Sequence, residues 1–324
     1  MSAPRFILAA ALALWGLLAE KAPSAVAETA FMPVTETVDL APSENGAKIY
    51  AHARAAAWLA ALRRASGFLL GRRELLIGDL SSEDRLALAA QLYTADVWSL
   101  AGPNQSLRLT VTLHPKPEAG LILARTLRNP EARLLRRRLL DEVSVALEAA
   151  AEAGTGERGT TEKLLDGLWL AQNAMELTAE GWYVEPQALS DMESAVSLAP
   201  QSAPAHLLLG EARLRSGLPQ QCAQACDEAL RLDSSLRRAR YIRALAHWRL
   251  QQFALAEDDL NASLADATPG EERIQRLQAR GAVRMLRGKY DGMCEDYMAA
   301  CSLGDCDGLK TLREQGYCKA ERAR

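Results

Sequence analysis

Histidine is scarce in this sequence of 324 residues: four are present, and no two of them lie at the spacing that metal ligands use. A Gly-x-Ser-x-Gly elbow, a His-Glu-x-x-His helix, a glycine-rich phosphate loop and a Cys-x-x-Cys pair are also missing. Each absence removes a common basis for catalysis or for metal and cofactor binding. We therefore expect a protein that is not an enzyme, with no cofactor, no metal and no catalytic residues.

The chain also has no large excess of charge of either sign, and few aromatic residues. The chain has 38 Lys and Arg against 41 Asp and Glu, a formal charge of -3, and only 5% aromatic residues. Binding of nucleic acid through counterion release requires a concentrated excess of basic residues, so nucleic acid is not an expected partner. What the chain does have is a 49% apolar fraction, rich in Ala and Leu, which indicates a folded and mainly helical protein.

The one long apolar run near the start is short for a membrane span. It extends from Phe6 to Ala19, follows Arg5 and precedes the small-x-small sequence Ala25-Val26-Ala27, an order typical of a secretory signal peptide. The alternative is a membrane anchor, but crossing a bilayer takes about 20 apolar residues. We predict cleavage near Ala27 and a mature protein without a membrane span, periplasmic or secreted, where cysteines can oxidise.

Two apolar periodicities alternate over residues 28–153, which predicts a small α+β domain. In chain order the patterns indicate a strand from Thr35 to Ala41, a helix from Ala47 to Ala65, a strand from Leu69 to Ile77, a helix from Ser82 to Leu92, a strand from Leu107 to Leu113 and a helix from Asn129 to about Ala153. Ser81 or Ser82 is the expected N-cap of the second helix, and Gly67 the expected C-cap of the first. Residues 154–163 form the expected linker.

This N-terminal half resembles a domain of bacterial envelope proteins, including flagellar assembly proteins. The resemblance consists of the Ala-rich helix before Gly67, a segment bearing Tyr93 and Trp98, and the strand from Leu107 to Leu113. It implies a role in the cell envelope. The basic run from Arg133 to Arg138 is either a solvated helix face, which is the usual meaning of such a run, or a contact for anionic lipid or a partner.

Small residues recur about every 34 residues in the second half of the chain. Equivalent positions of three successive blocks hold Gly210, Ala244 and Gly281. The pattern resembles the tetratricopeptide repeat family, in which small residues let two antiparallel helices approach closely. The resemblance implies units at about 167–202, which is degenerate, 203–236, 237–273 and 274–307, and a capping helix with a stapled tail at 308–324. The expected fold is mainly α: the small α+β domain, then an α-α superhelical repeat array with a C-terminal capping helix.

In that family the first helix of each unit lines a concave groove that binds a peptide or a partner helix. The corresponding positions here mix arginine with large apolar side chains, as the centres of interfaces do. They are Leu207, Glu211, Leu214, Arg215, Arg238, Tyr241, Leu245, Trp248, Arg249, Gln278, Met285 and Leu286. The alternative for Tyr241 and Trp248 is packing between adjacent helices.

Charge is sorted between the helices of the second and third blocks, with arginines on the first helices and acids on the second. Two interpretations stay open. The plainer one is that basic and acidic helices satisfy each other. If some arginines point into the groove instead, the partner is acidic or offers a C-terminal carboxylate, because guanidinium groups match carboxylates.

Four of the six cysteines lie close to the C-terminus. If one helix ends near Ser302 and an antiparallel capping helix follows, Cys301 and Cys306 flank the turn. Cys318, at the far end of the capping helix, then lies beside Cys294. We therefore predict the disulfides Cys294–Cys318 and Cys301–Cys306, and favour them over a four-cysteine zinc site, which lacks the usual paired spacing.

Cys222 and Cys226 are four residues apart on one predicted helix. Their Cβ atoms would lie about 5 to 6 Å apart, farther than an unstrained disulfide allows. We expect buried thiols, with a strained bond as the alternative if the helix is distorted.

The patterns together predict an exported, non-enzymatic scaffold that binds a protein or peptide in its repeat groove, within a bacterial envelope complex. One alternative is a periplasmic enzyme with its active site in the N-terminal domain, which requires a deep polar pocket holding His52 or His114 beside a carboxylate. Another is a structural lid whose array packs back on its own N-terminal domain. That arrangement would bury Tyr241 and Trp248 against the same chain.

Overall fold

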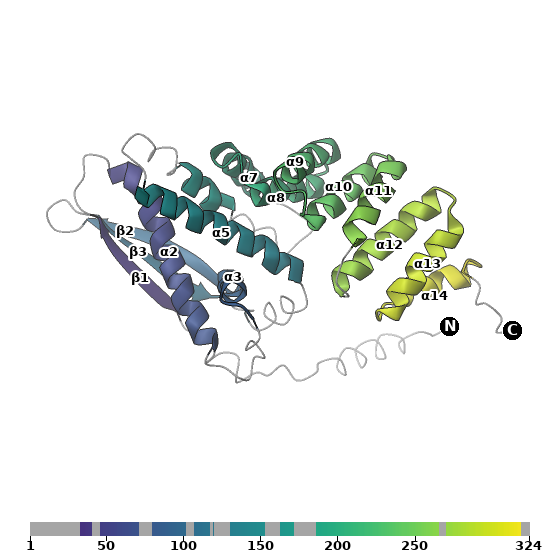
Figure 1. Ribbon diagram of the computed structural model, residues 1–324, viewed down its shortest axis with the longest axis horizontal. Coiled ribbons are helices and arrows are strands. Elements are labelled where there is room, and N and C mark those ends of the chain that lie inside the picture. The colour runs from purple at the N-terminus through teal and green to yellow at the C-terminus, as the bar shows by residue number, and fades with distance from the viewer. Residues whose placement is uncertain are drawn as a thin grey trace, which may run out of the picture.

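The computed structural model describes residues 33–40, 46–70, 80–101, 107–116, 119, 130–152, 163–171, 186–265 and 270–318. They form one three-stranded sheet at the N-terminal end and a stack of helices leading to the C-terminal end (Figure 1). The predicted fold class is thereby confirmed. The predicted signal peptide and linker lie outside the described residues. So does most of the strand expected from Leu69 to Ile77, whose first two residues belong to a helix instead.

The sheet has the strand order β1-β3-β2, and each neighbouring pair is antiparallel. β1 (Val34–Leu40) and β3 (Leu107–Pro115) lie where alternation predicts strands. Along β3, Leu109 and Leu113 are buried, whereas His114 is exposed. Because successive side chains of a strand point to opposite faces, this alternation turns one face of the sheet toward the helices.

β2 (Tyr93–Ala101) is a strand that the sequence patterns do not predict. It follows α3 (Ser82–Leu92) directly, and Tyr93 is both the C-cap of the helix and the first residue of the strand. No glycine, proline or polar cluster separates the two elements, so the usual local signal of a boundary is missing. α3 itself has the predicted bounds. Ser81 is its N-cap and accepts a hydrogen bond from the Asp84 N–H at 3.1 Å.

Helices cover one face of the sheet. α2 (Gly46–Leu70) packs on β1 and β3, and α3 and α5 (Pro130–Glu152) extend this helical layer (Figure 1). The prediction that Gly67 caps α2 is wrong, because the helix continues through Gly67 to Leu70. A Cβ atom at Gly67 would have no neighbour within 4 Å. No contact therefore forces the helix to end there, and a single glycine is tolerated inside it.

Beyond the sheet domain the chain folds into pairs of helices joined by short turns. Their bounds are α7 (Pro186–Leu198), α8 (Ala203–Arg215), α9 (Pro219–Leu232), α10 (Arg237–Arg249), α11 (Phe253–Leu264), α12 (Glu271–Leu286), α13 (Tyr290–Ser302) and α14 (Asp307–Glu314). α8 pairs with α9, α10 with α11 and α12 with α13, and each pair also contacts the next. α14 packs on α13 and closes the end of the stack.

Glycines lie where the helices of a pair come closest. A Cβ atom at Gly210 of α8 would lie 2.9 Å from Cys226 Sγ of α9. A Cβ atom at Gly281 of α12 would lie 2.7 Å from the Tyr297 ring of α13. Both distances are too short for real carbon contacts, so these helices approach as they do because the side chain is absent.

One continuous apolar core extends from Val34 in the sheet to Ala246 in α10. The helical residues 163–171 join the two halves: Trp169 packs edge-on against Trp58 of α2 at 5.4 Å between ring centroids, and Gly167 lies tightly against α7. The sheet domain and the first repeats therefore share one core. The last helices bury their apolar side chains in two smaller clusters instead.

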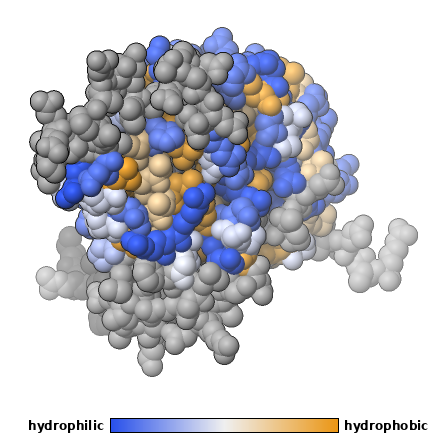
Figure 2. Space-filling view, turned by 60° about the vertical axis from the view of Figure 1, so that its left-hand side comes forward, coloured by the Kyte–Doolittle hydropathy of each residue, from blue (hydrophilic) through white to orange (hydrophobic). Residues whose placement is uncertain are grey.

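The side of the molecule that carries the sheet comes forward in Figure 2, where hydrophobic residues lie in narrow patches between hydrophilic ones. Trp98 on β2 is the most exposed aromatic residue of the sheet, at 46% of its surface. Within the part of the chain that the structure describes, no helix is both long and apolar enough to cross a bilayer.

Candidate functional site

A cavity of about 550 Å³ lies along the first helices of the three complete pairs, α8, α10 and α12. Its lining residues recur every three or four positions along each helix, because such positions share one face. They are Glu211, Leu214, Arg215, Arg238, Tyr241, Ile242, Leu245, Trp248, Arg249, Gln275, Gln278 and Ala279. We call this cavity the groove.

The structure brings nine of the twelve predicted groove residues together around this cavity. The other three are Leu207, Met285 and Leu286. Met285 and Leu286 are 38% and 51% exposed, and lie outside the lining. The prediction for Leu207 is wrong: this side chain is fully buried, because α5 of the sheet domain packs over α8 at that point.

Three lining residues, Ile242, Gln275 and Ala279, are absent from the predicted set. Ile242 and Ala279 directly follow the predicted residues Tyr241 and Gln278. In each turn of a helix, two neighbouring residues can face the same cavity, but the family resemblance gave only the first residue of each of these pairs. Gln275 lies one turn before Gln278, so the same periodicity extended by a turn would have found it.

The floor of the groove contains a buried carboxylate, Glu211, paired with arginine. Arg238 donates two hydrogen bonds to it, one of them from Nη2 to Oε2 at 3.1 Å, and Arg215 lies 3.9 Å away. Burial opposes ionisation of Glu211, but the ion pair with Arg238 outweighs it and holds the pKa of the carboxyl below its usual value. Glu211 is therefore an anion whose charge Arg238 already balances.

Tyr241 and Trp248 lie on the same helix but in different environments. Tyr241 is partly buried between the helices, with the Arg276 guanidinium 5.7 Å from its ring centroid, and burial raises the pKa of its hydroxyl. Tyr241 therefore packs between adjacent helices, as the alternative to a groove contact predicts. Trp248 leaves 43% of its surface exposed at the cavity. Next to it, Arg249 donates a hydrogen bond to the Leu214 carbonyl and crosses the groove from α10 to α8.

Several arginines of α10 and α12 outside the groove pair with acids of the neighbouring helices. Arg243 of α10 binds Asp259 at 2.8 Å and Asp227 at 2.7 Å. Arg280 and Arg284 of α12 hold the buried Asp296 at 2.6 and 3.0 Å. For these residues, the basic and acidic helices thus satisfy each other, and the arginines do not point into the groove. In the groove, Arg215 and Arg238 share Glu211, and Arg249 donates a hydrogen bond to the Leu214 carbonyl.

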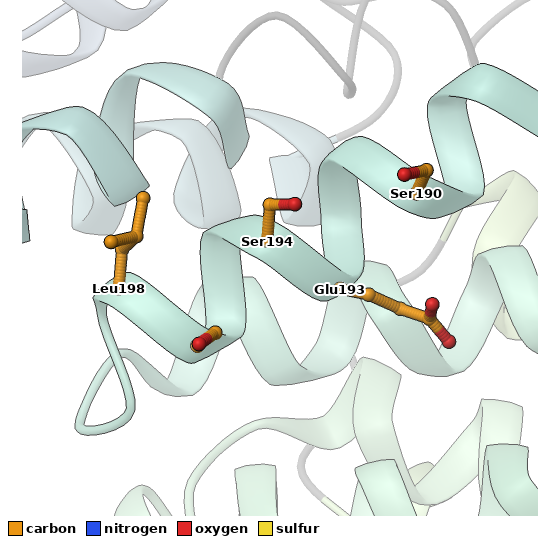
Figure 3. A pocket seen from close by; sticks show the side chains of 5 residues that line it. Ser190, Glu193, Ser194 and Leu198 are labelled. Carbon is orange, nitrogen blue, oxygen red and sulfur yellow. The ribbon is translucent and has the colours of Figure 1, made fainter.

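A second depression follows one face of α7 (Figure 3). Its lining residues are Ser190, Glu193, Ser194, Ser197 and Leu198. The Glu193 carboxylate extends away from the Ser194 hydroxyl and lies 3.3 Å from an Arg213 nitrogen of α8. Hydroxyl groups on a single helix do not converge on a ligand, so the groove is the stronger candidate site.

The terminal cysteines pair as predicted: Cys294 is bonded to Cys318 and Cys301 to Cys306. Cys222 and Cys226 are free thiols with buried side chains on α9. The contact with Cys222, together with burial, raises the pKa of Cys226 well above its usual value. A raised pKa disfavours the thiolate, which is the reactive form of a cysteine.

The enzyme alternative names two histidines, of which His52 lies partly buried on α2. His114 lies on the exposed face of β3, 3.3 Å from Asp96 of β2, and both side chains are open to solvent. Among the described residues, no cluster of three or more His, Cys, Asp or Glu side chains has an arrangement that could hold a metal ion.

The sequence and the fold can be compared with those of known proteins. No protein-family model matches the sequence, and no curated protein matches it. Among solved structures, a thermophilic TPR protein of Thermus thermophilus is similar, with 17% identity and a TM-score of 0.38 over 55% of this chain and 97% of that one. The resemblance of the N-terminal half to envelope proteins finds no support in these comparisons. The successive helix pairs and their close glycine contacts make the array a helical repeat.

Proposed function

We propose that this protein is an exported, non-enzymatic scaffold that binds an acidic protein segment in the groove. The observation that carries the proposal is the joint lining of the groove by exposed Trp248, by apolar Leu214 and Leu245, and by arginines in excess of acids. A TPR-like array suits this role because its first helices present one continuous surface to a partner.

The charge balance of the groove favours an anionic partner. Its lining contains three arginines, Arg215, Arg238 and Arg249, but only one acid, Glu211, which pairs with both Arg238 and Arg215. A cationic segment would meet this net positive charge. A carboxylate could receive paired hydrogen bonds from a guanidinium, as an internal Asp or Glu or as a free C-terminus.

Trp248 is the expected anchor for an apolar side chain of the partner. Tryptophan and arginine dominate the binding energy of many interfaces, especially beside a desolvated apolar pocket. Leu214 is almost fully buried and Leu245 partly buried, so they form a rigid apolar wall beside the exposed indole. The partner segment should therefore combine an apolar residue with nearby acids.

A peptide-binding experiment tests this proposal. Synthetic peptides with one large apolar residue flanked by acids are titrated into the protein, alongside peptides in which Lys replaces the acids. We expect acidic peptides to bind and Lys peptides not to bind. Trp248→Ala should weaken binding about thirtyfold, near 2 kcal/mol. Amidation of the peptide C-terminus shows whether the terminal carboxylate is the anion recognised.

Trp98→Ala is the matched control, because Trp98 is equally exposed but lies on the sheet. Arg249→Gln and Arg215→Gln should each weaken acidic peptides and flatten the salt dependence of binding. Equal binding of Lys peptides, or an equal loss in Trp98→Ala and Trp248→Ala, would exclude the groove as the binding site.

We also propose export and a place in a bacterial envelope complex. Support comes from the apolar N-terminal run with its small-x-small sequence and from two disulfides, which form and persist in oxidising compartments. N-terminal sequencing of protein recovered from the envelope fraction should begin at Glu28. An intact Met1 in protein confined to the cytosol would contradict this.

A further inference from the structure

Besides the helical residues 163–171, a row of side chains on α5 joins the sheet domain to the array. Leu134, Arg138 and Glu142 are spaced four residues apart, so they share a face of the helix. Leu134 and Leu207 of α8 line one small cavity, and Arg138 and Glu142 meet other parts of the array. The opposite face of α5 is tied to the sheet domain, where the buried Arg136 donates a hydrogen bond to the Ala90 carbonyl at 2.7 Å.

This row covers the first position of the groove. On α8, Leu207 lies one turn before Glu211 and belongs to the same helix face as the groove lining. It is nevertheless fully buried, in the small cavity that α5 closes together with residues 235–238. Arg238 lines both this small cavity and the groove. The covered position is therefore continuous with the groove.

The polar side chains of this row, Arg138 and Glu142, both contact the array, but the Glu142 carboxylate is only partly hydrogen-bonded. Arg138 donates a hydrogen bond to Ser235 at 2.8 Å and pairs with Asp233. The Ser202 hydroxyl, at the N-cap of α8, bonds to Glu142. The other carboxylate oxygen of Glu142 is buried without a hydrogen-bond partner among the described residues. An ionised Glu142 is therefore poorly stabilised at this contact.

We propose that α5 is a pH-sensitive clamp on the array: it covers Leu207 while Glu142 is protonated, and loosens when the Glu142 carboxylate ionises. The sheet domain keeps α5 when the contact opens, because Arg136 and the apolar face of α5 stay bound to it. An open clamp would lengthen the groove by one turn of α8. Only this last consequence rests on the proposed function; the clamp itself does not.

The charged groups around Glu142 agree with this behaviour. Burial, the largest effect, raises the pKa of Glu142 to about 7, and Asp141 adds to it; Ser202 and Arg138 oppose it. Across the contact, Asp233 and Arg237 face Arg138 rather than Glu142. His206 of α8, one turn after Ser202, has its Nε2 3.0 Å from the Pro200 carbonyl oxygen. Glu142 is thus the acid whose ionisation acts on the contact near neutral pH.

Hydrogen exchange of the full chain without a partner tests the clamp. Amide exchange in α5 and at the start of α8 is measured at pH 6 and pH 8 and corrected for the intrinsic rate. A carboxyl that ionises near pH 7 at the closed contact and near pH 4.5 in the open state predicts about tenfold more opening at pH 8. Glu142→Gln should abolish this difference.

Glu148→Gln is the matched control, because Glu148 is exposed on the same helix. It should keep the tenfold difference. Equal opening of the wild type at both pH values would overturn the proposal, as would a pH dependence that persists in Glu142→Gln and so belongs to another group, such as His206. Loss of peptide binding in Trp248→Ala reports on the groove separately, so failure of one proposal is distinguishable from failure of the other.

Discussion

Single residues at equivalent turns differ in backbone strain. The turns within the first and third complete pairs contain Gly217 and Gly288, with φ of 76° and 72°. The equivalent residue of the middle pair is Gln251, with φ of 59°. A side chain is unfavourable in this left-handed region, whereas glycine enters it freely.

We therefore expect Gln251→Gly to increase the free energy of unfolding by about 1 kcal/mol. Urea denaturation followed by circular dichroism measures it. Gly288→Gln, the reverse change in an equivalent turn, should decrease stability by a similar amount. Unchanged midpoints in both variants would show that these turns carry no strain.

A second residue-scale prediction concerns the close approach of α12 and α13. Gly281→Ala places a methyl group 2.7 Å from the Tyr297 ring. The helices must separate or the ring must move, at a cost of about 1 to 3 kcal/mol in unfolding free energy. Gly67→Ala, inside α2 with open space around it, should instead stabilise the protein by up to about 1 kcal/mol. Equal effects of the two alanines would contradict the close-approach argument.

The groove positions implied by the family resemblance include most of the lining, but they also include Leu207, which the structure buries. Nine of the lining residues lie at positions that the resemblance implies for a groove. Whether a residue on that face is open depends on what packs over it. α5 comes from a distant part of the chain, so no local pattern around Leu207 reports its burial.

At the scale of elements, the two disulfides differ in the length of chain they close. Cys294 and Cys318 are 24 residues apart, whereas Cys301 and Cys306 are 5 apart. Loop-closure entropy predicts a loss of about 3.5 kcal/mol on removing the first and about 2 kcal/mol on removing the second. Thermal unfolding of Cys294→Ser/Cys318→Ser and Cys301→Ser/Cys306→Ser double variants tests this order. A larger loss for the short loop would contradict it.

Element boundaries were predictable where a local chemical signal marks them. Ser81 before the acids of α3 gave the start of that helix, because its hydroxyl satisfies the Asp84 N–H. β2 was missed because Tyr93 passes from helix to strand without a turn residue. The predicted end of α2 at Gly67 was wrong because a residue type that often ends helices lies inside this one.

For the whole molecule, buried carboxyls predict how stability depends on pH. Despite burial, ion pairs lower the pKa of Glu211 and Glu257, so the folded state binds these protons less tightly. Their contribution is present above the unfolded pKa, about 4.3, and is lost as the pH falls through the folded pKa. Glu142 acts in reverse, because its folded pKa of about 7 makes ionisation destabilising as the pH rises.

We therefore expect the free energy of unfolding to be greatest near pH 5, to fall in acid, and to fall by about 2 to 3 kcal/mol between pH 5 and pH 8. Urea denaturation across this range measures the curve. Glu142→Gln should flatten the fall above pH 5 and leave the acid side unchanged. A Glu142→Gln curve parallel to the wild type would show that another group controls the alkaline side.

The apolar core is uneven along the molecule, and this has a consequence for how the chain comes apart. The sheet domain, α7 to α9 and part of α10 share one large core, whereas the last helices rely on two small clusters. Both disulfides lie at that thinly packed end. When they are reduced, a protease should cut first between residues 270 and 318, releasing a resistant N-terminal fragment, so that the far repeat is lost while the rest of the molecule persists.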